Sequence, residues 1–305
     1  MGHSIKGHIF QGNKTKPVVV FVHGLGLNSR IWTDMLNYRV LSGTLPIKVF
    51  IPGENLKSRS DIFYRSFRKE NRCVPLWDGL KQAGFNLICW SERIPYNTVA
   101  ESVKELSEVV DTARTAFPGV PVALIGHSRG GIVARKYLEQ NAQRIQALIT
   151  ISTPHGGSYV SSLAVRISPL FRNIKVKAIH NLALQGLISL IQSEAIHELY
   201  PGSEFLTNLK DMPSEHIRYL SFGAINPFGF IQAFRKHPNL AKLINILSSF
   251  VCPNEIIYGR GDGFVTDKSA HIPWAEKHFT LDENHASILC SNTVLKLVTD
   301  MLNGL

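Results

Sequence analysis

The most informative feature of the sequence is a serine between two glycines, in the pattern Gly-His-Ser-Arg-Gly at residues 126–130. The apolar run Val122–Ile125 precedes this pattern, and a stretch with helical periodicity follows it. A sharp turn from strand to helix strains the backbone of such a serine and presents its hydroxyl outward. The helix N-terminus adds positive potential where an oxyanion would form. A bare G-x-S-x-G pattern also arises by chance, so the flanking elements carry the prediction that Ser128 is an acyl-transfer nucleophile.

A serine hydroxyl needs a general base and a carboxylate that orients this base. When the serine follows a strand in this way, the acid and then the histidine come later in the chain. Asp262 lies in the glycine-flanked loop 261–265, and His285 lies in a polar turn after the strand-like segment His278–Leu281. We therefore expect Asp262 and His285 to act with the serine, and Asp267 is the alternative acid.

Four further histidines lie near these motifs. His271 and His278 also follow the acid, but the polar turn at His285 suits the base better, so we expect surface or packing positions for both. His127 and His155 come before the acid, which is too early in the chain for the base. We expect both to be structural.

Acyl transfer also requires hydrogen-bond donors for the tetrahedral oxyanion. The backbone N–H of Arg129, directly after the nucleophile, is the first candidate. The second is the N–H of Leu25 in the His-Gly-Leu-Gly segment 23–26, which follows the apolar run Val18–Val22. The alternative for this segment is an ordinary glycine turn after a strand.

Apolar runs alternate with helix-period stretches, which predicts a mostly parallel sheet flanked by helices. Runs of this kind are typical of strands buried on both faces. The expected strands are Val18–Val22, Phe85–Trp90, Val122–Ile125, Ala147–Ile151 and Ile217–Phe222. The expected helices are Val99–Ala116, with Asn97 or Thr98 as N-cap, and Ile132–Leu138.

Two stretches interrupt this alternation. Residues 35–75 form one insertion, and residues 158–213 hold amphipathic helical signals between two expected strands. We predict that residues 1–157 and 214–305 form the core and that 158–213 form a helical cap or lid. The alternative is that 158–213 are ordinary packing helices. Residues 225–250 form a further insertion, a detour from the alternating pattern, whose structure the sequence does not predict.

The net charge is +10, and the excess lies in the N-terminal quarter. Basic and aromatic side chains are densest at residues 57–72, which contain Lys57, Arg59, Arg65, Arg68, Lys69 and Arg72 together with Phe63, Tyr64 and Phe67. Such a segment suits an anionic membrane surface or a nucleic acid. The simpler interpretation is a solvated loop or helix. Because no nucleic-acid-binding motif accompanies the charge, no nucleic-acid partner is predicted.

Four cysteines occur, Cys73, Cys89, Cys252 and Cys290, and no pair has C-x-x-C or zinc-finger spacing. Cys89 lies within an expected strand and is predicted to be buried. The spacing gives no ground to expect a disulfide framework.

The first ten residues contain no apolar signal core, and Lys6 stands where a myristoylation pattern needs Ser or Thr. No apolar run reaches the roughly 18 residues of a transmembrane helix. These observations predict a soluble protein with a cytoplasmic location. The oligomeric state cannot be predicted.

Together these motifs resemble the lipase and esterase branch of the α/β-hydrolases, which contains bacterial triacylglycerol lipases. The matching segments, in chain order, are Val22–Gly26, residues 126–130, the Ser-Thr-Pro-His-Gly-Gly run at 152–157, a cap-like segment at 201–206, residues 261–265 and Asn284-His285. The resemblance implies an α/β-hydrolase fold with a cap. It also implies a triad of Ser128, Asp262 and His285, with Leu25 and Arg129 as oxyanion donors.

Some features depart from that branch. The insertion at 35–75 is long, and no secretion signal is visible. No carboxylates match the calcium site that some of these lipases hold, so neither a metal nor a cofactor is expected. The predicted function is hydrolysis of lipid or other acyl esters. An acyltransferase, thioesterase or peptidase could use the same triad, and an inactive scaffold that binds a membrane through 57–72 is a third alternative.

Overall fold

The computed structural model describes residues 7–51, 73–94, 96–174, 176, 179–210, 213–227 and 260–305. In these residues a single seven-stranded sheet has the order β1-β4-β2-β5-β6-β7-β8. All neighbouring strands are parallel except β1, which pairs antiparallel with β4. The strands are β1 Gly7–Phe10, β2 Val18–Val22, β4 Asn86–Trp90, β5 Val122–His127, β6 Ala147–Ile151, β7 Arg218–Ala224 and β8 Lys277–Leu281.

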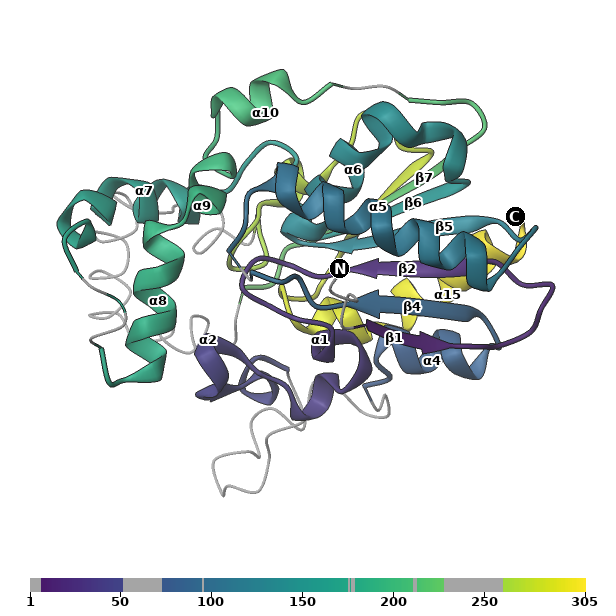
Figure 1. Cartoon of the computed structure of the whole chain (residues 1–305), viewed down its shortest axis with the longest axis horizontal. Coiled ribbons are helices and arrows are strands. Elements are labelled where there is room, and N and C mark those ends of the chain that lie inside the picture. The colour runs from purple at the N-terminus through teal and green to yellow at the C-terminus, as the bar shows by residue number, and fades with distance from the viewer. Residues whose placement is uncertain are drawn as a thin grey trace, which may run out of the picture.

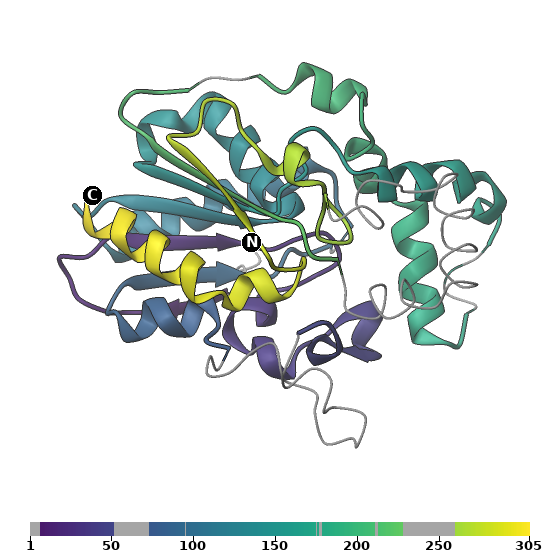
Figure 2. The same ribbon diagram turned by 180° about the vertical axis from the view of Figure 1, so that it is seen from behind.

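Helices cover both faces of this sheet, as the fully buried strands β2, β4, β5 and β6 require. Alternate side chains of β2 point to opposite faces, so Val20 packs in one core and Phe21 in the other. The first core lies under α5 (Val99–Ala116) and α6 (Arg129–Asn141), which lie in front of the sheet in Figure 1. The second lies under α4 (Leu76–Gln82) and α15 (Asn292–Asn303), and α15 crosses the opposite face in Figure 2.

The predicted strands are confirmed with shifts of at most two residues at their ends, because apolar residues predominate in each. The long predicted helix matches α5 at both ends. Its N-cap is Thr98, whose hydroxyl accepts a hydrogen bond from the Glu101 N–H at 3.3 Å. Strand β1 was not predicted, since it is an exposed edge strand of four residues without an apolar run.

The segment between β6 and β7 contains α7 (Tyr159–Phe171), α8 (Leu182–Gln192), α9 (Glu194–Glu198) and α10 (Glu204–Asn208). Helices α7, α8 and α9 stand beyond the carboxyl ends of the parallel strands in Figure 1. The helical signals predicted within 158–213 are therefore confirmed. The role of this segment as a lid stays a prediction.

The insertion that was predicted at 35–75 contributes short elements up to residue 51. They follow α1 (Arg30–Thr33) and are η1 (Met35–Asn37), α2 (Val40–Gly43), β3 (Leu45–Pro46) and η2 (Ile47–Phe50). The basic-aromatic segment 57–72 lies outside the described residues, as does most of the detour at 225–250.

Cys73 and Cys290 form a disulfide, although the spacing of the cysteines gave no reason to expect one. They are 217 residues apart in sequence, while their Cα atoms lie 5.1 Å apart. Proximity of this kind arises from the tertiary fold, so local spacing does not reveal it. Cys89 is buried, as predicted, and it is a free cysteine. In the described segments, no helix combines the length and the apolar character that a bilayer span would need.

Candidate active site

Ser128 occupies the turn between β5 and α6. Its backbone has φ 54° and ψ −131°, a conformation that residues other than glycine rarely adopt. The turn is tight on both sides, because a Cβ at Gly126 would lie 2.4 Å from the Gly131 Cα and one at Gly130 would lie 2.2 Å from the Val22 carbonyl oxygen. The Ser128 N–H donates to the Ile151 carbonyl at 2.9 Å. The strand, the turn and the helix thus have the strained arrangement predicted from the motif.

Asp262 and His285 are in direct contact. His285 Nδ1 lies 2.7 Å from Asp262 Oδ2, and the other carboxylate oxygen accepts the N–H groups of Phe264 and Val265 at 2.9 and 2.8 Å. Asp262 is fully buried. Burial alone would raise the pKa of its carboxyl, but the neighbouring His285 and these hydrogen bonds lower it below the ordinary value. An ionised carboxylate therefore accepts the Nδ1–H of His285 and leaves Nε2 free.

The alternative acid, Asp267, lies with a different histidine. Its two carboxylate oxygens bind His278 Nε2 at 3.1 Å and Thr280 Oγ1 at 3.0 Å. His278 Nδ1 in turn lies 2.8 Å from the hydroxyl of Ser221, whose side chain is fully buried. This second Ser-His-Asp arrangement attaches α14 (Asp267–Ala270) to β7 and β8, and none of its three residues lines the pocket that Ser128 lines. The structure brings Asp262, not Asp267, to His285.

Ser128 and His285 line the same pocket, which has a volume of about 290 Å³. Its walls are mostly apolar and come from three parts of the chain. They include Leu27, Ile31, Val40, Ile47 and Phe50 on one side, Val160, Leu190, Ile196 and Leu199 from the α7–α9 segment, and Phe264, Val265, Ala286 and Leu289 beside the histidine. An apolar group can therefore be buried next to the serine.

His127 supports the loop of His285. Its Nε2 lies 3.0 Å from the His285 carbonyl oxygen, and the two rings are 4.7 Å apart between centroids. A carbonyl only accepts, so Nε2 carries the proton. Burial, followed by the neighbouring His285, lowers the pKa of His127 to about 3, which keeps the ring neutral. These contacts agree with the structural role expected for His127.

His155 is half-buried. Its Nε2 lies 3.2 Å from the Thr150 hydroxyl, and burial holds its pKa well below the ordinary value for histidine. His271 packs against His278, with ring centroids 4.7 Å apart. None of the contacts described for these three histidines involves Asp262 or His285. This agrees with the structural role expected for His155 and with the surface or packing positions expected for His271 and His278.

The loop that carries Leu25 passes directly against the serine. A Cβ at Gly24 would lie only 3.1 Å from the Ser128 Cβ, and Gly26 has φ 68°. His23 holds this loop: its Nδ1 donates to the Gly24 carbonyl at 2.9 Å, and its Nε2 accepts the Glu92 N–H at 3.2 Å. Burial lowers the pKa of His23, so the ring stays neutral with this tautomer. Leu25 lines the pocket beside the serine.

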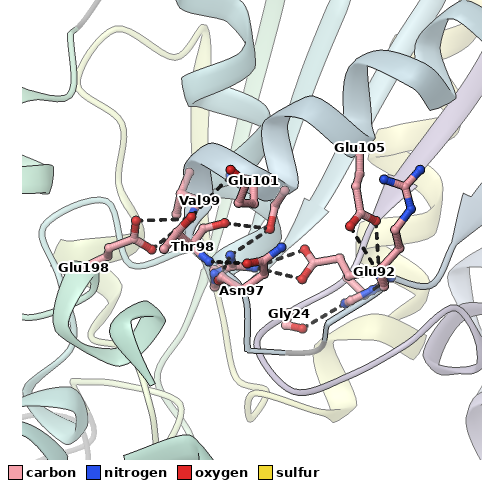
Figure 3. Close-up of polar contacts among 12 residues, drawn as sticks. Gly24, Glu92, Asn97, Thr98, Val99, Glu101, Glu105 and Glu198 are labelled. Atoms are coloured by element: carbon pink, nitrogen blue, oxygen red, sulfur yellow. Dashed lines mark hydrogen bonds and ion pairs between the residues drawn. The ribbon is translucent and has the colours of Figure 1, made fainter. Parts of the chain in front are cut away.

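The side chain of Arg129 has a role that the sequence did not predict. It is fully buried and forms an ion pair with Glu92, with Nη1 at 3.1 Å from Oε1. Its Nη2 donates to the Asn97 carbonyl at 2.5 Å and to the Ser102 hydroxyl at 2.8 Å. Figure 3 shows Glu92 and Asn97 beside the first turn of α5. Glu92 follows β4 among polar residues, and no motif marks it in the sequence.

The same turn of α5 also binds a side chain from α9. The carboxylate oxygens of Glu198 accept the Val99 N–H at 2.9 and 3.1 Å (Figure 3). The α9 helix, which lines the pocket through Ile196, is thereby attached to the α5 N-terminus. In the part of the chain that the structure describes, no cluster of three or more His, Cys, Asp or Glu side chains is arranged to hold a metal ion.

Comparisons with known proteins agree with this fold. Residues 79–201 match the family model Hydrolase_4, described as serine aminopeptidase, S33. The mature form of the Bacillus licheniformis lipase BlEst2 aligns with a TM-score of 0.61 at 19% identity over 99% of each chain. A metagenomic carboxyl esterase aligns with a TM-score of 0.56 at 12% identity, over 97% of this chain and 78% of its own. No curated protein matches the sequence significantly.

Proposed function

Because the chain has the α/β-hydrolase fold that its motifs predicted, and resembles lipases and esterases within it, we propose that it is a serine hydrolase that cleaves carboxylic esters of apolar acyl groups. The observation that carries the proposal is the contact of 2.7 Å between His285 Nδ1 and Asp262 Oδ2, made beside a pocket that Ser128 and His285 both line. An imidazole oriented in this way can act as the base for a serine hydroxyl.

In the proposed reaction, Ser128 Oγ attacks the ester carbonyl carbon while its proton passes to His285 Nε2. The N–H groups of Leu25 and Arg129 bind the resulting oxyanion. The intermediate expels the alcohol, which takes the proton from His285, and the acyl group stays on the serine. Water then attacks the acyl-enzyme with His285 as base and releases the carboxylic acid. Asp262 stabilises the imidazolium in both steps.

The lining of the pocket supports the proposal that the pocket binds an apolar acyl group of the substrate. None of its described lining residues is Asp or Glu. A serine aminopeptidase must hold the ammonium group of a peptide, and a buried cation needs an anionic or strongly accepting partner. The lining therefore favours an ester over a peptide with a free N-terminus. We propose lipid or other acyl esters as the substrate class, with contact to a lipid surface through 57–72 and the α7–α9 segment.

Ser128→Ala tests the proposal. We expect kcat on a nitrophenyl ester to fall by roughly 10³-fold or more while the fold is retained. Wild-type protein should react with a fluorophosphonate probe, and the variant should not. Ser221→Ala is the matched control, because it removes the serine of the second Ser-His-Asp arrangement and should keep both labelling and turnover. Near-wild-type turnover in Ser128→Ala would refute the proposal.

An acyltransferase, a thioesterase or a peptidase would form the same acyl-enzyme, so only an analysis of the products distinguishes these activities from ester hydrolysis. Turnover in the presence of an alcohol distinguishes hydrolysis from transfer, and dominant transfer would identify an acyltransferase. Esters of increasing chain length, with and without micelles, distinguish a lipase from an esterase. Absence of fluorophosphonate labelling in folded protein would favour an inactive binding scaffold.

A further inference from the structure

The ion pair between Glu92 and Arg129 is among the most deeply buried polar contacts near the pocket. The two side chains are 1% and 0% exposed, respectively. Removing both charges from water is costly. Replacing a buried ion pair by apolar side chains of similar size often leaves the stability of a fold unchanged or increases it. The pair is therefore weak evidence for a role in stability, and its position in the site is more informative.

Each member of this pair is attached to one of the two loops that would supply oxyanion donors. The guanidinium belongs to the residue whose backbone N–H is the first donor. It is fixed by Glu92, by the Asn97 carbonyl and by the Ser102 hydroxyl, so the start of α6 is anchored beside the serine. A planar guanidinium that makes several hydrogen bonds has one orientation.

Glu92 is attached to the second loop through its backbone. Its N–H donates to His23 Nε2 at 3.2 Å, and His23 Nδ1 donates to the Gly24 carbonyl at 2.9 Å. Leu25, the second donor, is the next residue. Backbone and side chain of Glu92 thus connect the two loops through contacts that are all buried.

We propose that the Glu92 carboxylate and the Arg129 guanidinium are positioning residues of the oxyanion hole, which hold the N–H groups of Leu25 and Arg129 at the spacing that the tetrahedral intermediate needs. This inference rests on the proposed function. Neither side chain touches the substrate, since neither lines the described pocket. By positioning these N–H donors, the pair stabilises the transition state, because the donors must be placed to within a fraction of an ångström.

The experiment compares Glu92→Gln and Arg129→Lys with wild type. Active sites are first counted by complete labelling with a fluorophosphonate, so that kcat is expressed per competent site and misfolded protein is not counted. We expect kcat per site to fall about 10- to 100-fold with KM changed less than about 3-fold. The inhibition constant of a trifluoromethyl ketone, whose adduct mimics the oxyanion, should rise in parallel with the loss in kcat.

Glu105→Gln is the matched control. Glu105 is likewise a buried carboxylate close to Glu92, but it accepts the Arg93 N–H and does not contact Arg129. We expect its kcat per site and its inhibition constant to equal those of wild type. A loss in Glu105→Gln as large as in Glu92→Gln would overturn the inference, because any buried carboxylate would then have the same effect.

Glu92→Gln leaves the buried charge of Arg129 without its partner and can prevent folding. The double variant Glu92→Met/Arg129→Met removes both charges and keeps the volume, so it should fold. We expect the same loss of kcat per site in this variant. Wild-type kcat per site and ketone affinity in the folded double variant would overturn the inference. If wild-type protein does not react with the fluorophosphonate, the proposed function fails, and the inference fails with it.

Discussion

The residue before the candidate nucleophile holds the backbone of the candidate base: His127 Nε2 donates to the carbonyl oxygen of His285 across 3.0 Å. The contact joins the end of β5 to the loop after β8, which are far apart in the chain. Burial, followed by the neighbouring His285, lowers the pKa of His127 to about 3, so the ring that donates this hydrogen bond is neutral.

This pKa predicts a loss of stability in acid. The unfolded chain binds a proton at His127 below about pH 6.5, whereas the folded protein does not until about pH 3. The unfolded state therefore binds more protons in this window, and the free energy of unfolding falls as the pH falls. His127→Gln should make the slope of unfolding free energy against pH shallower by about 1.4 kcal/mol per unit. Urea unfolding between pH 4 and 6 measures it, and an unchanged slope would contradict the assignment.

Asp262 and Asp267 contact different histidines, so replacing each by asparagine should affect kcat differently. Asp262→Asn removes the carboxylate that orients His285, so kcat should fall roughly 10³- to 10⁴-fold. Asp267→Asn alters only the contacts with His278 and Thr280, and kcat should stay near wild type. Steady-state kinetics on a nitrophenyl ester measures both. Equal losses in the two variants would mean that Asp262 has no special place in the reaction.

The pocket predicts how a substitution in α8 changes the preference for the acyl chain length of the ester. Leu190 lines the pocket, so Leu190→Trp should fill part of the space for an acyl chain. We expect the ratio of kcat/KM for an octanoate ester to that for an acetate ester to fall about 10-fold, the effect of one or two methylene contacts. Leu182→Trp on the same helix is the control, because Leu182 is 57% exposed and does not line the pocket. An equal change in both variants would place the acyl chain elsewhere.

The disulfide predicts sensitivity to reductants. Cys73→Ser/Cys290→Ser should lower the free energy of unfolding by about 2 to 4 kcal/mol, because the cross-link restricts the unfolded chain. Dithiothreitol should have the same effect on wild type and none on the double variant, as measured by urea unfolding. Peptide mapping under non-reducing conditions should recover the two cysteines in one linked product. Alkylation of both without prior reduction would show that the bond is absent.

Sequence reasoning was most successful where local residues determine local geometry. The glycines around Ser128 and the apolar runs of β2, β5 and β6 predict the elbow and the strands, because sterics and burial act over a few residues. The partnership of Asp262 with His285 follows from chain order within this type of fold, and the contact of 2.7 Å agrees with it.

The remaining features depend on contacts between distant residues. A charged side chain beside the nucleophile suggests exposure to solvent, yet Arg129 is buried because Glu92 and the first turn of α5 meet it. The edge strand β1 has no apolar run to reveal it. The pairing of Cys73 with Cys290 depends on how the segment before α4 meets the end of η6 (Ser287–Cys290). No spacing rule predicts these contacts.

The bond between Cys73 and Cys290 closes a covalent ring that contains Ser128, Asp262 and His285. A single proteolytic cut anywhere between these cysteines would open the ring without separating the fragments. The serine and the histidine would then remain parts of one molecule, and a nicked protein would migrate as an intact chain until it was reduced. If the protein has the proposed esterase activity, limited digestion of the oxidised protein should leave that activity in place, whereas digestion of the reduced protein should remove it.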